Sequence, residues 1–314
     1  MTFEDEEMND EIEQLPLSDA IDTLILMHRD VHYGGKFPIM IEYYENGGKG
    51  IVLDFEIARI RELQLAEKNL GQDLAPQVLS GADAEKVAKA KEAYKKLRDL
   101  YGVRKDEKAS AVSHYPSLLA DLILSEEEEP KAEIAAIVAE KGAIVPALLD
   151  LLRSEDFHDP LFPGYGLGPS LAAKCLGLIG DKRAIVTLFE TIGEEDFAFE
   201  NLALEGLKAI GEPAQAFLLK VLHGRPITYD NERAAIGLLQ FKDSPEVAAA
   251  FFKMLKEIDL SQHQILATYL ILGCEGVTDE TDRRAFIALG DALKTPKVLK
   301  QDFHTIAEHW KGKS

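Results

Sequence analysis

The chain has 314 residues and a formal net charge of −20 at pH 7, and 46% of its residues are hydrophobic. This length suits two ordinary domains or one extended array, and the composition is that of a folded protein. The acidity disfavours nucleic-acid binding, because a chain this acidic repels phosphate backbones. No apolar run approaches the roughly 18–20 residues that span a bilayer, so we expect no membrane segment.

The N-terminus and the cysteines indicate a cytoplasmic protein. Residues 1–16 are acidic and lack the basic-then-apolar order of a signal peptide, so we predict a disordered tail there. Cys175 and Cys274 lie far apart in the sequence. Free thiols in a reducing compartment are therefore expected.

We predict that residues 17–110 form a divergent helical N-terminal region, in which no repeat is visible. Four segments carry apolar residues at helical spacing: about 18–31, 37–48, 51–70 and 83–101. The first would place Ile21, Leu24, Ile25, His28 and Val31 on its buried face. We favour an extension that caps a helical array over a separate domain, because an uncapped array leaves an apolar face in water.

His28 and His32 are four residues apart on one predicted helix, a spacing that can bind a metal ion. Further ligands are not evident nearby, and His28 lies on the apolar side. We therefore predict a packed core histidine, with no metal and no cofactor.

Residues 111–314 are predicted to form the main helical array. Residues 102–110 form the boundary by composition, and a helix is expected at about 115–124. The run SEEEEP at 125–130 is interpreted as a solvated first turn of the next helix. Further helices, EIAAIVAEKGAIVPALLDLL at 133–152 and two near the C-terminus, complete the array, and the last is a cap that carries Trp310.

The main irregularity is the inserted loop 154–169 (SEDFHDPLFPGYGLGP), whose three prolines and three glycines exclude a helix. Loops of this length in a folded protein are commonly functional or disordered. The aromatic residues Phe157, Phe162 and Tyr165 argue against disorder.

From Leu171 to about Leu293 one pattern returns every 31 residues, marked by Gly180, Gly211, Lys242 and Gly273. Each ends an apolar run, and in the first three units a second apolar run follows, as in LGLIGDKRAIVTL and LKAIGEPAQAFLL. A fixed period of this length is typical of stacked supersecondary units. Within a unit the apolar residues follow helical spacing, so each unit reads as a helix pair.

Details of the unit support the helix pair. Equivalent positions of successive units form a column when the units are aligned. One such column contains small or short side chains, as close helix packing would require: Cys175, Gly206, Gly237 and Thr268. Gly180 and Gly211 are placed to end helices in the left-handed conformation. The acids Asp181, Glu212 and Asp243 then suit the next helix N-terminus, and Pro213 and Pro245 suit its first turn.

These residues resemble HEAT-like repeats, in particular the short bacterial type of phycobilisome-lyase-like proteins. The resemblance covers 171–274 clearly, and 133–152 with a shifted spacing. It implies an all-α, right-handed α-solenoid of stacked antiparallel helix pairs (HEAT-like or ARM-like) with a helical N-terminal extension. It says little about function.

Three activities are known in HEAT-like folds, and the sequence supports none strongly. The lysine hydroxylase type needs His-Glu dyads, which this chain lacks, and the DNA glycosylase type needs a cationic groove. The bilin-lyase type would want an aromatic pocket with an acid, which Tyr165, Phe162 and Asp159 could supply. Cys175 lies in the interface column, so we expect it to be inert.

The favoured hypothesis is a protein-interaction scaffold whose extended surface binds a basic partner. The alternative is a small-molecule or chromophore-handling enzyme of the lyase type, and the oligomeric state stays open. The residues predicted to bind the partner lie in the loop and along the second helices: Phe157, His158, Phe162, Tyr165, Glu190, His223, Arg225 and Tyr229.

Overall fold

The computed structural model describes residues 20–48, 54–101, 114–193, 197–292 and 297–312. Within these ranges all regular secondary structure is helical and no strand occurs, which confirms the predicted all-α class. Among the helices so described, none combines the length and the continuous apolarity needed to cross a bilayer. The predicted tail 1–16 and the boundary segment 102–110 lie outside the described residues.

The N-terminal part contains a group of helices close to those predicted. They are α1 (Ala20–His32), α2 (Phe37–Glu45), α3 (Ile57–Leu70), α4 (Ala75–Val78) and α5 (Ala82–Leu100). The helix predicted over 51–70 begins later than expected, at Ile57, and residues 54–56 before it are not helical. It ends as expected at Gly71, which adopts the left-handed conformation.

The buried face of α1 differs from the predicted one. Ile21 and Leu24 are 52% and 40% exposed, whereas Asp22 and Arg29 are almost fully buried beside Ile25. The reason is electrostatic, because both charged side chains find ion-pair partners on α3 and near residue 73. The spacing of apolar residues in the sequence does not reveal such ion pairs.

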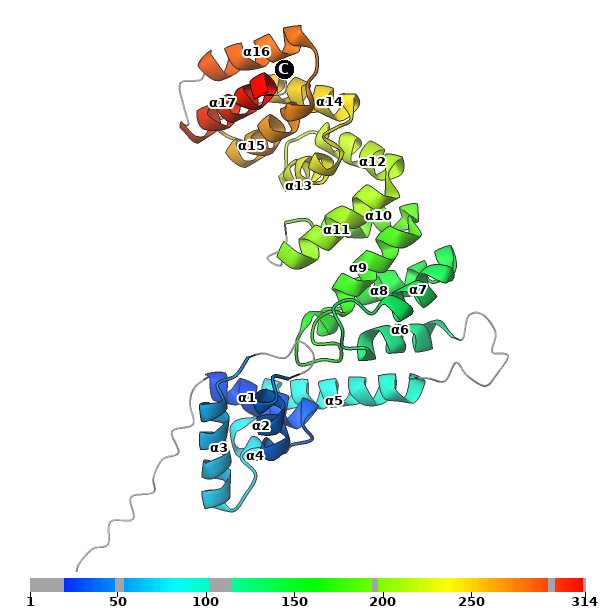
Figure 1. The fold of residues 1–314 in the computed structure, drawn as a ribbon, viewed down its shortest axis with the longest axis vertical. Coiled ribbons are helices and arrows are strands. Elements are labelled where there is room, and N and C mark those ends of the chain that lie inside the picture. The colour runs from blue at the N-terminus through cyan, green and yellow to red at the C-terminus, as the bar shows by residue number, and fades with distance from the viewer. Residues whose placement is uncertain (1–19, 49–53, 102–113, 194–196, 293–296, 313–314) are drawn as a thin grey trace, which may run out of the picture.

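The remainder of the chain forms helices that pack mainly on their neighbours in sequence (Figure 1). The first are α6 (Tyr115–Leu124), α7 (Lys131–Ala139), α8 (Val145–Leu152), α9 (Gly168–Ile179), α10 (Ile185–Glu190) and α11 (Phe197–Ile210). They continue with α12 (Glu212–Leu222), α13 (Tyr229–Leu238), α14 (Pro245–Glu257), α15 (Gln264–Gly273), α16 (Glu280–Ala292) and α17 (Lys297–Gly312). Short 3₁₀ turns lie at Lys141–Ala143, Asp156–His158, Lys182–Ala184, Leu239–Phe241 and Cys274–Gly276.

Two layers run through this region. Helices α11, α13, α15 and α17 lie on one side of the elongated molecule in Figure 1, and α10, α12 and α14 lie on the other. Contacts follow the same order, because α9 packs on α11, α13 on α15, and α15 on α17. Helices α11, α13 and α15 also pack on α10, α12 and α14 of the other layer, and α17 packs on α16.

Helices α9 and α11 approach each other closely. A Cβ atom placed on Gly177 would lie 2.6 Å from the Cα of Gly206, closer than packed atoms allow. Cys175, Gly206 and Gly237 are buried as predicted, whereas Thr268 of the same column is half-exposed. The small residues therefore permit one tight crossing and do not repeat it at every unit.

The predicted helix boundaries hold at the first repeat and vary at the second. Gly180 ends α9 in the left-handed conformation, and Asp181 accepts a hydrogen bond from the Arg183 amide at 2.9 Å. Gly211 has φ of +78° but ψ of −134°, which lies outside the left-handed helical region. Pro213 and Pro245 both lie in first turns as expected.

The buried side chains form two apolar cores. One joins α1–α5, and the other runs from α6 to α17. Leu161 and Phe162 of the loop 154–169 belong to the first core, although the helices on either side of the loop, α8 and α9, belong to the second. The loop therefore fastens the N-terminal helices to the rest of the molecule.

Replacement Gly177→Ala should lower the free energy of unfolding by about 1–3 kcal/mol, because the added methyl group has no room against α11. Gly312→Ala is the matched control, since a Cβ there meets no atom within 4 Å. Urea unfolding of both variants measures the effect. Equal stabilities would contradict the tight crossing.

Candidate functional site

The residues predicted to bind a partner all lie at turns that join one helix pair to the next. Phe157, His158, Phe162 and Tyr165 lie between α8 and α9, Glu190 ends α10, and the others lie between α12 and the first residue of α13. The structure thus distributes them over three successive turns.

The loop residues mostly face the protein interior. Phe162 is 3% exposed within the N-terminal core, and Phe157 packs on the core of α8 and α9. Tyr165 is half-buried and donates a hydrogen bond to Glu126 at 3.1 Å. His158 is exposed, and its ring stacks edge-on against Phe199 at 4.9 Å between centroids. In this arrangement Phe162 has no surface left for a partner.

The other predicted residues are exposed, and two of them contact neighbouring turns. Tyr229 donates a hydrogen bond to the Gly193 carbonyl at 3.0 Å, and the Arg233 guanidinium lies 4.7 Å from its ring centroid. Arg225 lies 3.4 Å from Glu257 at the end of α14. Glu190 and His223 are exposed at the ends of their helices.

A buried polar cluster joins the loop to α1 and α5. The Tyr94 hydroxyl lies 3.0 Å from Nδ1 of His32, and Tyr94 and Tyr165 both donate to Glu126. Glu126 and Tyr165 have φ of +53° and +52°, conformations that cost a residue with a side chain about 1–2 kcal/mol. The prediction that the run 125–130 is a solvated first turn of the next helix is wrong, because α7 begins only at Lys131. Glu127–Glu129 are exposed, but two tyrosines bind Glu126.

The two histidines of α1 are neutral near pH 7. Burial lowers the pKa of His28 to about 4, and burial together with the neighbouring His28 lowers the pKa of His32 to about 3. His28 is 2% exposed, as predicted for a packed histidine, and its Nδ1 atom makes no hydrogen bond to any residue that the structure describes. Within the described residues no group of three His, Cys, Asp or Glu side chains could hold a metal ion.

Chemical reactivity is not evident at the cysteines or beside the loop. Cys175 is fully buried as predicted, and burial raises the pKa of its thiol to about 12. A hollow of about 540 Å³ lies between α1, α5 and the loop, and Lys86 forms an ion pair with Asp159 across it. Three residues could have walled a chromophore pocket. Asp159 lines this hollow and, together with Phe162, a smaller one of about 290 Å³ between α5 and the loop. Tyr165 binds Glu126 instead.

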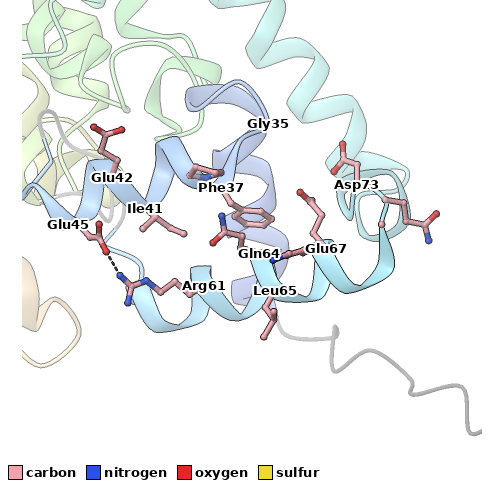
Figure 2. Close-up of a pocket in the computed structure, with 14 residues that line it drawn as sticks. Gly35, Phe37, Ile41, Glu42, Glu45, Arg61, Gln64, Leu65, Glu67 and Asp73 are labelled. Atoms are coloured by element: carbon pink, nitrogen blue, oxygen red, sulfur yellow. Dashed lines mark hydrogen bonds and ion pairs between the residues drawn. The ribbon is translucent and has the colours of Figure 1, made fainter.

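A groove with a volume of about 1160 Å³ lies between α2 and α3 (Figure 2). Its floor contains Phe37 and Ile41, which are almost fully buried, and Leu65 projects from α3 with 57% of its surface exposed. Charged side chains form the rim, and Arg61 pairs with Glu45 across it. The other lining residues are Gly35, Pro38, Glu42, Gln64, Glu67, Lys68, Gly71, Gln72 and Asp73.

Arg29 holds the walls of this groove together. Its guanidinium is fully buried and lies 2.5 Å from Glu67, 2.6 Å from Asp73 and 2.6 Å from Asp30. It also lies 4.7 Å from the ring centroid of Phe37 on the groove floor. Burial opposes ionisation of Asp73, but the hydrogen bonds from Arg29 lower the pKa of that carboxyl.

Comparison of the chain with protein-family models, with curated proteins and with solved structures finds no match.

Replacement Arg29→Met should destabilise the protein by about 3–5 kcal/mol, because three carboxylates would lose the cation that they share. Arg61→Met is the matched control, and it should cost less than about 1 kcal/mol because Arg61 is 59% exposed. Thermal or urea unfolding compares the two. Equal losses would show that Arg29 does not organise the groove.

Stability should also fall as the pH is lowered from 6.5 towards 4.5. The unfolded chain binds protons on His28 and His32 near pH 6.5, while the folded protein takes them up only at about pH 4 and below. Roughly 2 kcal/mol should be lost for each buried histidine by pH 4.5. The difference in unfolding free energy between pH 7 and pH 4.5 should shrink in His28→Gln and stay unchanged in His304→Gln, an exposed control.

Proposed function

We propose that the protein is an interaction scaffold in which residues 171–293 form a HEAT-like α-solenoid and a basic segment of a partner protein binds the groove between α2 and α3. The regular spacing of the repeat and the packing of helices on their sequence neighbours support the solenoid. The groove is the observation on which the binding function rests.

The groove suits a segment of protein chain. Its volume of about 1160 Å³ lies above the usual range of roughly 300–1,000 Å³ for small-molecule pockets. The floor is apolar, the rim is charged, and two helices form the long walls, as in grooves that receive an amphipathic helix. No lining side chain resembles an activated nucleophile, which favours binding over catalysis.

The charge of the groove favours a basic partner. Its lining contains four carboxylates, Glu42, Glu45, Glu67 and Asp73, against the two cations Arg61 and Lys68. Arg29 and Arg61 already bind three of these carboxylates, and exposed Glu42 makes no ion pair within the described residues. With a net charge of −20, the whole protein should also speed the approach of a basic segment.

A random peptide library displayed on phage, selected on the purified full chain, tests this proposal. Recovered peptides should combine apolar residues with Lys or Arg, and raised salt should weaken their binding. Leu65→Asp and Glu42→Lys should each reduce the affinity of a recovered peptide roughly tenfold, a loss of about 1.4 kcal/mol.

Ile39→Asp is the matched control, because Ile39 is 46% exposed on α2 but does not line the groove. It should leave the affinity unchanged. Peptides that are rich in acidic residues, or that bind the Leu65→Asp and Ile39→Asp proteins equally well, would contradict binding in the groove.

A further inference from the structure

Helix α15 has no polar face. Its sequence is QILATYLILG, in which Gln264 and Thr268 are the polar side chains. One side of the helix fills the core through Leu266, Leu270 and Ile271, all of which are fully buried. A helix that is apolar all round is ordinarily covered on all sides, so the opposite side requires an explanation.

That opposite side is open. Ile265 is 61% exposed, Leu272 is 37% exposed, and Thr268 and Tyr269 are half-exposed between them. The spacing of 0, 3, 4 and 7 residues places these four side chains in one line along the helix. We call Ile265, Thr268, Tyr269 and Leu272 the α15 stripe.

Carboxylates of three other helices interact with residues of the α15 stripe. Tyr269 lies near Glu200 of α11 and Glu232 of α13, and burial together with these carboxylates raises the pKa of its hydroxyl. Asp302 of α17 lies beside Thr268. Within the described residues no Lys or Arg pairs with these three acids, and burial raises the pKa of Glu232 and of Asp302.

We propose that the α15 stripe is a second docking surface and that it binds a basic amphipathic helix of a partner protein. The apolar side of such a helix covers Ile265 and Leu272, and its Lys or Arg side chains reach Glu200, Glu232 and Asp302. The inference rests on the proposed scaffold function, but it concerns a surface on the repeat helices, whereas the groove lies between α2 and α3.

Charge decides between the candidate occupants. A second copy of the chain would bring its own three carboxylates against these, and like charges across an interface cost several kcal/mol. An anionic membrane surface would be repelled for the same reason. A basic helix covers the apolar side chains and also neutralises the acids, so it satisfies both features of the stripe.

The test uses a synthetic, fluorescently labelled helical peptide of leucine and lysine, and a matched peptide of leucine and glutamate. Fluorescence anisotropy measures binding to the full chain carrying Leu65→Asp, so that the groove does not contribute. Adding Ile265→Asp, Leu272→Asp or Glu232→Lys should weaken the lysine peptide roughly tenfold, and the glutamate peptide should not bind.

Ile287→Asp on α16 is the matched control, because Ile287 is 39% exposed and lies outside the stripe. Equal binding of the lysine peptide to the Ile265→Asp and Ile287→Asp proteins would overturn the inference. A dimer seen in sedimentation that Ile265→Asp abolishes would also overturn it. So would flotation of the protein with anionic vesicles, if Ile265→Asp abolishes that flotation. If Leu65→Asp leaves phage-selected peptides bound while the stripe variants lose the lysine peptide, the groove proposal fails and this inference stands.

Discussion

The structure depends on apolar contact between helices that are neighbours in sequence. An amphipathic helix pair cannot bury both of its apolar faces alone, so each pair must share its core with the next. The contact is tight where Gly177 meets Gly206 and the backbones of α9 and α11 approach each other. Because the pairs follow one another in a line, the molecule is elongated, and its turns and outer helix faces stay accessible (Figure 1).

The loop 154–169 connects the helices from α6 onward to the N-terminal helices α1–α5. Leu161 and Phe162 enter the core of α1–α5, and Tyr165 joins Tyr94 on the carboxylate of Glu126. The loop is therefore a connecting element that fixes the helices bearing the α2–α3 groove. Its prolines and glycines prevent a helix, and its aromatic residues Phe162 and Tyr165 make the contacts with the neighbouring elements.

Much of the fold could be predicted from the sequence, because apolar spacing reports helices directly. The 31-residue period, the end of α9 at Gly180 and the two last helices were all visible. The burial of Arg29 and Asp22 was not visible, because it depends on acids and bases that lie far away in the sequence. A charged residue on the apolar side of a predicted helix is the signal that could have revealed Arg29.

The candidate surfaces were harder to predict than the helices. Aromatic residues in or beside a turn look the same in sequence whether they are buried, like Phe162, or exposed, like Tyr229. The α15 stripe has the composition of a core helix, and only packing shows that Ile265 faces outward. The groove exists only once α2 and α3 are placed side by side.

Small-angle X-ray scattering of the full chain tests most directly whether helix pairs touch only their neighbours. A compact chain of 314 residues would have a radius of gyration of roughly 20 Å. Helix pairs arranged in a line should give a clearly larger radius of gyration and an asymmetric distance distribution with a long tail. A symmetric distribution with a radius of gyration near the compact value would contradict it.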